Sequence, residues 1–538
     1  MPAARLTQIR LRNFKSIGPE EQTVDLKPLT VLIGRNNSGK STVIQSLLLL
    51  KQTLEDPRPE VQLALQGNYV RATSLRELTH GWPEDMTGKG PEITLRWDST
   101  QDALKLRDRL LALEELERRG AISVAPIDGF LKTVPSDFWS RGANSSEMVL
   151  CFRDLSSAVV AQDIALRTLW SEPGIPQVPM KAAWRDGTRK LEWEGEGTLP
   201  LTEDRFMPYE DSSEFSTNKT NRAIVIVFRL LYKQQLEALK SLLVGAGYVS
   251  SSREEVPPYY ARPTSTPTRN VLPNGGNAPE LLYGRQADVV HRAAMSSAEA
   301  SSQPFSLPGT ILSMPLREAV NDVLRYLGIE SSVSFADVQE LGLFRMLFGR
   351  APLNHVGRGI GHILPVIVAG LLSDPLLGQT LDPNTTLSGY LERCPYSPIL
   401  ALEELESHLH PKAQTRLAHV LVALARSGRQ LIVETHSDHL VRRLRGLIAR
   451  AEPGSETEKW LLENINIVEV EQTPEGVTYI HQAQLTREGS IEQWPADFMD
   501  ESSDEERAIY FAAMQKTPPE APPADESFFT DVPVNGKG

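Results

Sequence analysis

Apolar and polar residues near the start of the chain follow three successive patterns. Leu6–Ile17 alternates between the two kinds, which is typical of a strand with one buried face. Leu29–Ile33 is a nearly unbroken apolar run, which predicts a strand covered on both faces. Ser41–Leu54 is predicted as a helix, and the loop Gly34–Lys40 separates it from that strand. Strand, glycine loop and helix in this order form the setting that a phosphate-binding loop requires.

The middle of the chain gives weaker patterns. Leu104–Arg119 has leucines at helical spacing and charges on the other face, so it predicts an amphipathic helix. Ala223–Val244 favours a second helix, although its first half also fits a strand. Ser251–Gly276 is rich in Pro, Ser, Thr and Gly and is expected to be mostly loop. Pro315–Leu327 predicts a helix with proline in its first turn.

Alternation of strand and helix returns towards the C-terminus. Ser397–Leu402 and Gln430–Val433 are short apolar runs that predict buried strands, and Pro411–Arg426 between them predicts a helix. This alternation favours a largely parallel sheet. Ile465–Glu471 and Gly476–Gln482 are expected to form a terminal hairpin.

These elements predict an α/β fold in which a mixed, largely parallel sheet carries the phosphate-binding loop. A chain of 538 residues exceeds the size at which one core stops growing, so several lobes are expected. Residues 1–100 and 396–500 are assigned to the two parts of the head that holds the sheet. We expect a large helical and irregular insertion at 101–306, a helical lobe at 307–395 and a mostly disordered tail at 501–538.

The charge balance and the two cysteines narrow the class of protein. The chain has 56 Lys and Arg against 69 Asp and Glu, a formal net charge of −13, which argues against a whole-molecule polyanion binder. Cys151 and Cys394 form no CxxC pair, so we expect no cysteine zinc site and a reducing compartment. Residues 1–14 lack the apolar block of a signal peptide, and the apolar stretch around Pro365–Leu372 is too short to span a bilayer. A cytoplasmic location without a membrane partner is therefore expected.

Gly34–Ser41 reads G-R-N-N-S-G-K-S, which is the complete G-x-x-x-x-G-K-S pattern. Its glycines let backbone N–H groups close around phosphate oxygens, helped by the start of the following helix. Lys40 is expected to reach the β- and γ-phosphates of ATP, and the Ser41 hydroxyl to bind Mg²⁺. The alternative, a glycine turn that only caps a helix, is disfavoured by the strand before it. The residues predicted to contact ATP here are Gly34, Asn36, Asn37, Ser38, Gly39, Lys40, Ser41 and Thr42.

Glu403 and Glu404 directly follow an apolar run, at the carboxyl edge where open α/β sheets bind their ligands. We assign Glu403 to Mg²⁺, through a coordinated water, and Glu404 to polarising the attacking water. Two glutamates can also simply begin a solvated helix. The phosphate-binding loop elsewhere in the chain favours the nucleotide interpretation.

His436 lies at the end of the next predicted strand, in the run Glu434–Ser437 (ETHS). A lone histidine is more often a structural residue than a catalytic one. Its place one strand from the glutamates favours a hydrogen bond to the γ-phosphate. Lys40, Glu404 and His436 are therefore the predicted catalytic residues.

Together these motifs resemble the ABC-type ATPase heads of the SMC, RecF and OLD-nuclease group, which are often called AAA ATPases. Leu11–Ser16 is similar to the opening L-x-N-F-K-S strand of that group. Glu403–Pro411 resembles its E-E-P-E-x-H-L-H-P run, with Leu405 in place of the proline, and Thr435–Ser437 matches its T-H-S switch. The resemblance implies an ABC-like head that binds ATP and hydrolyses it with Mg²⁺.

The resemblance also implies a signature motif ahead of Glu403. Val356–Pro365 (VGRGIGHILP) is similar to the version V-G-x-G-x-S-Q-x-L-P, in which a glycine-rich helix start contacts the γ-phosphate of ATP held by a second subunit. This implies a homodimer or a higher homo-oligomer. Gly361-His362 replaces Ser-Gln, which removes the hydroxyl that usually contacts phosphate. The residues placed at the second ATP are Gly357, Gly359 and Gly361.

Two further segments narrow the resemblance. Gly489–Phe498 resembles the G-x-x-x-x-W-P-x-x-F end of a domain of unknown function that a subset of these ATPases carries. Asn274–Leu282 resembles a G-x-x-x-x-x-L-L segment of the same subset. Such proteins resemble the ATPase components of prokaryotic anti-phage and DNA-processing systems. The resemblance thus implies a protein effector, a nuclease or similar, that is encoded nearby.

Other functions compete with an ATPase that drives an effector. The altered Gly361-His362 pair favours an ATP-dependent switch or scaffold with little hydrolysis. A DNA-repair-type ATPase that binds DNA directly also stays open, although Arg442, Arg443 and Arg445 fit a solvated helix face better than a phosphate contact. An OLD-type nuclease needs a metal-binding domain of about a hundred residues after the head. We do not expect one in the chain that follows the hairpin.

Overall fold

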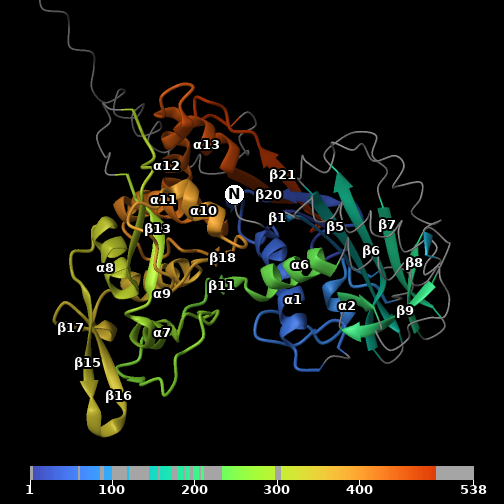
Figure 1. Ribbon diagram of the computed structural model, residues 1–538, viewed down its shortest axis with the longest axis horizontal. Coiled ribbons are helices and arrows are strands. Elements are labelled where there is room, and N and C mark those ends of the chain that lie inside the picture. Colours follow the sequence, from blue (N-terminus) through green and yellow to red (C-terminus); the bar gives the residue numbers. More distant parts are fainter. Residues whose placement is uncertain are drawn as a thin grey trace, which may run out of the picture. The chain divides into compact units, whose positions relative to one another are not determined.

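The computed structural model of the chain (Figure 1) places its elements in two compact units, Met1–Gln493 and Trp494–Gly538, and all described residues belong to the first. The predicted tail at 501–538 therefore lies outside the described residues, as does most of Gly489–Phe498. The structure describes residues 4–58, 61–84, 90–99, 118–119, 144–155, 158–170, 178–185, 188–193, 198–204, 207–210, 233–296 and 304–491.

A six-stranded sheet carries the predicted motifs. Its strands lie in the order β11 (Gly247–Val249), β18 (Ile399–Glu403), β19 (Gln430–Glu434), β3 (Leu29–Ile33), β20 (Ile465–Gln472) and β21 (Thr478–Ala483). The first five strands run parallel, and β21 pairs antiparallel with β20. Every residue of β3, β18 and β19 is buried, as expected for strands that are apolar on both faces. The predicted mixed, largely parallel α/β sheet is confirmed.

Strand order brings the motifs to one edge of this sheet. β19 lies between β3 and β18, although it follows both of them in the sequence. The carboxyl ends of parallel strands lie at the same edge of a sheet. The loop after β3, the glutamates that end β18 and the polar run that ends β19 therefore meet there.

A second, antiparallel sheet packs nearby. Its strands lie in the order β10 (Met207–Glu210), β9 (Thr198–Asp204), β8 (Thr188–Trp193), β7 (Val178–Arg185), β6 (Ala158–Trp170), β5 (Asn144–Leu155), β4 (Glu92–Ser99), β1 (Ala4–Arg12) and β2 (Gln22–Asp25). Six of these strands come from the segment 101–306, which we expected to be helical and irregular, so that expectation is wrong for β5 to β10. Met148, Leu150 and Phe152 are buried at every second position of β5, and this alternation is the strand signal that was missed.

Helix α1 (Lys40–Glu55) lies between the two sheets. Its run of leucines is buried on nearly all sides, and it contacts α6 (Gln234–Val244). The core cluster around α1 joins residues of β1, β4 and β5 to Ile399 and Ala401 of β18. A helix that is apolar all round is stable only when covered in this way.

The opposite face of the six-stranded sheet is covered by α9 (Arg358–Leu372) and α11 (Pro411–Arg426). Both helices contact strands of this sheet, and neither contributes to the core cluster around α1. Helix α12 (Asp438–Ala449) contacts α11. The remaining elements are α2 (Leu75–Leu78), β12 (Tyr260–Ala261), α7 (Ala278–Arg285), β13 (Val289–Ala293), β14 (Ile311–Pro315), α8 (Leu316–Tyr326), β15 (Val333–Val338), the 3₁₀ helices Gln339–Leu341 and Leu353–His355, β16 (Leu343–Phe348), β17 (Ala351–Pro352), α10 (Leu387–Arg393) and α13 (Glu456–Asn464).

The predicted elements agree with the structure to different degrees. The predicted helix Pro411–Arg426 and strand Leu29–Ile33 match residue for residue, and the terminal hairpin is present. The first strand ends at Arg12 and not at Ile17, because Asn13 and Lys15 adopt left-handed backbone with φ of 52°.

The three segments of the middle of the chain that gave weak sequence patterns have different outcomes. The helix predicted at Leu104–Arg119 lies outside the described residues except for its last two. The helix predicted from Ala223 begins at Gln234 within the described part. Ser251–Gly276 is loop apart from β12, as expected. Among the described residues, no helix is long and apolar enough to cross a membrane.

Candidate nucleotide-binding and hydrolysis site

The loop Gly34–Ser41 connects β3 to α1, and its glycines are required by close packing. Gly34 has a φ of 147°, and a Cβ there would lie 2.2 Å from the carbonyl oxygen of Val470 on β20. Gly39 has a φ of 104°, and a Cβ there would lie 2.5 Å from Thr478 Oγ1 on β21. Both conformations are ones that residues with side chains rarely adopt. The neighbouring strands therefore hold the loop in its phosphate-binding shape.

The other loop residues predicted to contact ATP lie at different depths. Asn36 and Asn37 are exposed, whereas Ser38 is buried. Thr42 lies on the buried side of α1, with its hydroxyl 3.4 Å from Ser16 Oγ. Ser16 ends the L-x-N-F-K-S run, so the structure places that run beside the first turn of α1.

The Lys40 ammonium folds back over the loop. Its Nζ donates hydrogen bonds to the carbonyl oxygens of Gly34 at 3.1 Å and Arg35 at 2.8 Å. Burial lowers the pKa of Lys40, while the charges of Glu434 and Glu404 act in the opposite direction. Lys40 is therefore held by neutral oxygens that an anionic phosphate can replace.

The Ser41 hydroxyl contacts a carboxylate on the neighbouring strand. Ser41 Oγ donates a hydrogen bond to Glu434 Oε2 at 2.9 Å, and Lys40 Nζ lies 4.0 Å from Glu434 Oε1. Burial and then the charge of Glu403 raise the pKa of Glu434, against the hydrogen bond from Ser41, and the net value is about 7. The Glu434 carboxylate thus lies next to both Lys40, which was assigned to phosphate, and Ser41, which was assigned to the metal.

Glu403 is the last residue of β18, and its side chain is buried. Its Oε2 accepts a hydrogen bond from the backbone N–H of Ser251 at 3.2 Å, and Arg253 Nη2 donates to its carbonyl oxygen at 2.9 Å. Burial raises the pKa of Glu403, while the hydrogen bonds from Ser251 and Tyr248 lower it. The Oε1 atom is buried and has no hydrogen-bond partner among the described residues.

Glu404 leaves the strand with unusual backbone geometry. Its φ is 44°, in the left-handed region, and its N–H donates to the carbonyl oxygen of Glu434 at 3.0 Å. Residues of this kind are held in such a conformation only where the surroundings fix it, and they cluster at functional sites. The half-buried Glu404 carboxylate is near enough to Lys40 and His436 for its charge to raise the pKa of both.

His436 lies at the rim of this edge. Its backbone N–H donates to Glu406 Oε1 at 2.7 Å, which fixes the turn after β19. Partial burial lowers the pKa of His436, and the charge of Lys40 lowers it further, against the charge of Glu404. The shift favours the neutral imidazole, whose ring can donate one hydrogen bond and accept another.

Three residues near the predicted set had no assigned role. Glu434 ends β19 as Glu403 ends β18, so its position at a strand end was a usable signal. Glu406 belongs to the quoted run after Glu403, and burial raises the pKa of its carboxyl. Arg253 lies in a Pro- and Ser-rich segment, where no periodicity indicates a contact with β18.

The signature-like motif opens a helix, as predicted. Gly357 precedes the first turn of α9, and a Cβ on Gly359 would lie 2.5 Å from the carbonyl oxygen of His408. The rings of His362 and His408 are 4.6 Å apart and nearly perpendicular. The motif is thus packed against the loop that follows Glu403 and Glu404.

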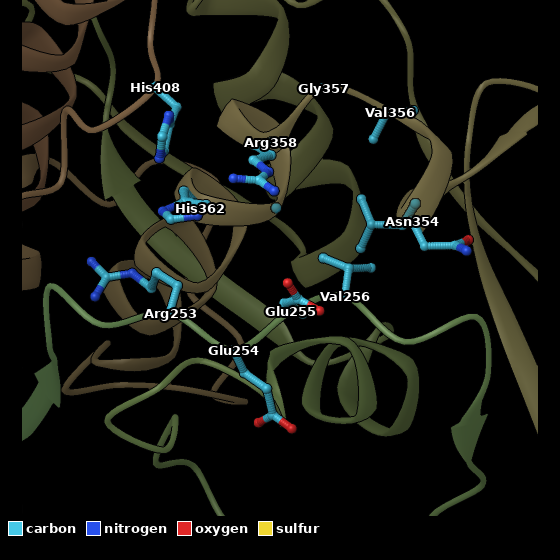
Figure 2. Close-up of a pocket in the computed structure, with 12 residues that line it drawn as sticks. Arg253, Glu254, Glu255, Val256, Asn354, Val356, Gly357, Arg358, His362 and His408 are labelled. Atoms are coloured by element: carbon cyan, nitrogen blue, oxygen red, sulfur yellow. The ribbon is translucent and has the colours of Figure 1, made fainter.

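A pocket of about 390 Å³ lies beside this motif. Figure 2 shows Arg253, Arg358 and His362 around it, with His408 next to His362. Gly357 and Gly361 also line the pocket, whereas no residue of Gly34–Ser41 does. The signature glycines and the phosphate loop therefore do not line this pocket together.

The residues at the sheet edge fit a magnesium ion that arrives with a nucleotide. Ser41 offers a hydroxyl and Glu403 a buried carboxylate oxygen without a partner. Among the described residues, no three His, Cys, Asp or Glu side chains could hold a metal by themselves. Mg²⁺ in nucleotide sites takes one or two carboxylates and completes its shell with phosphate and water, so a larger cluster is not needed.

Two family models match the chain. The model described as "AAA ATPase domain" matches residues 5–98, which include the phosphate-binding loop. The model described as "AAA domain, putative AbiEii toxin, Type IV TA system" matches residues 353–442, which include the signature-like motif, both glutamates and His436. Both matched segments are thus similar to AAA ATPase domains, and they contain the motifs that the strand order brings to one edge of the sheet.

The solved structures similar to this chain include three SMC heads. An SmcHead bound to the C-winged helix domain of ScpA is 11% identical with a TM-score of 0.35, over 89% of this chain and 98% of that chain. The SMC head domain from Thermotoga maritima is 12% identical with a TM-score of 0.32, over the same shares. The Smc head with an extended coiled coil from Pyrococcus furiosus, bound to the C-terminal domain of ScpA, is 11% identical with a TM-score of 0.35, over 96% and 100%. At these TM-scores the likeness adds no support, and no curated protein matches.

Proposed function

We propose that the protein binds ATP with Mg²⁺, hydrolyses it, and uses dimerisation around ATP to regulate a partner effector. The observation that carries this proposal is the strand order β18, β19, β3, which gathers the phosphate loop and the predicted catalytic residues at one edge. The hydrogen bond from Ser41 to Glu434 connects the phosphate loop directly to the end of β19.

Each predicted residue has a role in hydrolysis that its position supports. Lys40 exchanges the carbonyl oxygens of Gly34 and Arg35 for the β- and γ-phosphates, which carry full charge. Bound Mg²⁺ would be held by Ser41 and Glu403, where it neutralises charge on the phosphates. Catalysis of phosphoryl transfer otherwise depends on positioning and electrostatics.

Glu404 and His436 act on the attacking water and the γ-phosphate. Glu404 directly follows β18 with left-handed backbone, and Ser407 Oγ lies 3.4 Å from its Oε2. It accepts a proton from the water or orients it by hydrogen bonding. The neutral His436 ring donates a hydrogen bond to the γ-phosphate, so it reports the presence of ATP and not of ADP.

A second copy of the chain is proposed to complete the site. Gly357, Gly359 and Gly361 open a helix beside a pocket that holds no residue of the phosphate loop. The start of this helix and the exposed Arg358 beside it offer backbone N–H groups and a positive charge to the γ-phosphate bound by the partner copy. Dimer closure would then depend on ATP.

The effector is proposed to be a nuclease or similar protein encoded nearby, in an anti-phage or DNA-processing system. The proposal is supported by the resemblance to ATPase components of anti-phage systems. It is also supported by the match of residues 353–442 to a domain described as a putative AbiEii toxin of a Type IV TA system. Direct binding of DNA remains a separate proposal. Co-purification of the chain with the products of its neighbouring genes tests the effector proposal, and an ATP-independent complex would contradict the regulatory part.

The hydrolytic role is tested by Glu404→Gln. This variant is expected to reduce ATP turnover by about 100-fold or more, since it removes the group that activates water, while the affinity for ATP changes less than about threefold. Turnover is measured by phosphate release and affinity by equilibrium binding of a fluorescent ATP analogue. Unchanged turnover in Glu404→Gln contradicts the assignment.

A second candidate function is an ATP-dependent switch with little hydrolysis. It is favoured by the Gly361-His362 pair, which lacks the usual hydroxyl, and by the packing of the His362 ring against the ring of His408. A wild-type rate equal to that of Lys40→Ala, combined with tight ATP binding, would establish this function in place of the first.

A further inference from the structure

Glu434 is a buried carboxylate that the proposed hydrolysis leaves without a role. Its side chain lies at the edge where β3 passes into the phosphate loop, and the residue is only 7% exposed. Ser41 Oγ donates to its Oε2 at 2.9 Å, and Lys40 Nζ lies 4.0 Å from its Oε1. Glu434 therefore touches both loop residues that are proposed to handle phosphate and metal.

Glu403 supplies a second carboxylate at the same place. It is the cross-strand partner of Glu434 in the parallel pair β18–β19, and it is 6% exposed. Like charges on neighbouring strands repel, and burial strengthens the repulsion. Lys40 offsets part of this charge in the nucleotide-free protein, but it is expected to turn towards the phosphates when ATP binds. The carboxylate pair then requires another cation.

The spacing of the oxygens around Ser41 fits magnesium. Mg²⁺ holds its octahedral ligands at about 2.0–2.1 Å, so neighbouring ligand oxygens lie about 3 Å apart. Ser41 Oγ and Glu434 Oε2 are 2.9 Å apart. A metal ion can therefore replace the hydrogen bond between them without a large movement of either side chain.

We propose that Glu434 is a direct ligand of Mg²⁺ beside Ser41, and that Glu403 completes the acidic side of the site through a coordinated water. This inference rests on the proposed function, because the metal arrives with ATP. In the nucleotide-free protein, Glu434 also holds Ser41 and Lys40 in the positions that ATP and the metal will use.

The test compares metal affinity with nucleotide affinity in Glu434→Gln. Mn²⁺ replaces Mg²⁺, and its binding is followed by electron paramagnetic resonance in the presence of a non-hydrolysable ATP analogue. We expect Glu434→Gln to weaken Mn²⁺ binding by about 10- to 100-fold, the range seen when metal sites lose a supporting carboxylate. Affinity for the analogue in EDTA should stay within about twofold, because glutamine still accepts the hydrogen bond from Ser41.

Two further variants make the result specific. Glu471→Gln removes the same charge from an exposed position near the end of β20 and should leave Mn²⁺ affinity unchanged. Glu434→Asp keeps the charge but shortens the side chain, so it should bind Mn²⁺ more tightly than Glu434→Gln. Circular dichroism verifies that each variant is folded.

The outcomes separate this inference from the proposed function. Mn²⁺ affinity in Glu434→Gln and Glu434→Asp within about twofold of the wild-type value overturns the inference and leaves the proposed function standing. An equal loss of analogue binding in EDTA also overturns it, because Glu434 would then only shape the loop. Wild-type protein that binds no nucleotide overturns both.

Discussion

At the scale of single residues, the site is a balance between buried carboxylates and the Lys40 ammonium. Glu434 is the cross-strand partner of Glu403, and the charge of Glu404 also acts on it. Ser41 and Lys40 of the phosphate loop lie next to its carboxylate. Without nucleotide and metal, Lys40 acts on Glu434 and the Arg253 guanidinium on Glu403, and the carboxylates of Glu403, Glu404 and Glu434 outnumber these two cations. This excess of negative charge predicts that the stability of the nucleotide-free protein depends on pH.

The pH dependence follows from the raised pKa of Glu434, which is about 7 in the folded protein. Its ordinary value in an unfolded chain is about 4.3, so between these values the folded protein binds more protons than the unfolded chain. The free energy of unfolding contributed by this group therefore falls as pH rises through about 7. Glu434→Gln should remove that contribution and be more stable than wild type at about pH 8.

Thermal unfolding of both proteins without nucleotide and metal measures this difference. Other groups titrate in the same pH range. The quantity to compare is therefore the difference in melting temperature between wild type and Glu434→Gln, measured once at about pH 5.5 and once at about pH 8. A gap that does not change with pH contradicts the raised pKa and the buried carboxylate pair.

The sequence predicts the individual site residues unevenly. Lys40, Ser41, Glu403 and Glu404 could be proposed as site residues because their motifs link a residue type to a strand end or a helix start. Glu434 is also at a strand end, but a single glutamate gives no motif by itself. Arg253 reaches β18 from a loop, and a loop contact depends on tertiary structure that no local pattern records.

At the scale of elements, the phosphate loop depends on its packing against β20 and β21. Gly34 leaves no space for a side chain against Val470, and its φ of 147° is strained for any other residue. Gly34→Ala is therefore expected to displace the loop and to weaken ATP binding by at least about tenfold. Equilibrium binding of a fluorescent ATP analogue measures the loss.

Gly446→Ala is the matched control for this substitution. Gly446 lies within α12, and a Cβ there meets no atom within 4 Å. Alanine should stabilise the helix by about 0.5–1 kcal/mol and leave ATP binding unchanged. Equal nucleotide affinity in Gly34→Ala and wild type contradicts the proposed loop geometry.

Elements with strong local signals were predicted well. Strand β3 is apolar throughout, and α11 begins at Pro411 with the His410 side chain accepting from the Lys412 N–H at 3.3 Å. The strands β5 to β10 were missed although the alternate positions Met148, Leu150 and Phe152 of β5 are apolar and buried. The end of the first strand depends on left-handed residues at Asn13 and Lys15, which the alternation does not indicate.

At the scale of the whole molecule, the order of strands in the sheet turns separate motifs into one site. Motifs show which residues belong to a nucleotide site, but local patterns do not place β19 between β3 and β18. Helix α1 packs on one face of this sheet, and α9 and α11 pack on the other. The same arrangement leaves the signature glycines beside a separate pocket, so the complete site is proposed to need two copies.

The most direct test of hydrolysis at a dimer interface is the rate of ATP turnover per subunit as a function of protein concentration, with Mg²⁺ present. We expect a Mg²⁺-dependent rate well above that of Lys40→Ala, and a rate per subunit that rises with concentration until the dimer is saturated. A rate equal to that of Lys40→Ala at every concentration would contradict the proposed hydrolysis. A substantial rate per subunit that stays constant down to concentrations where the protein is monomeric would contradict the composite site.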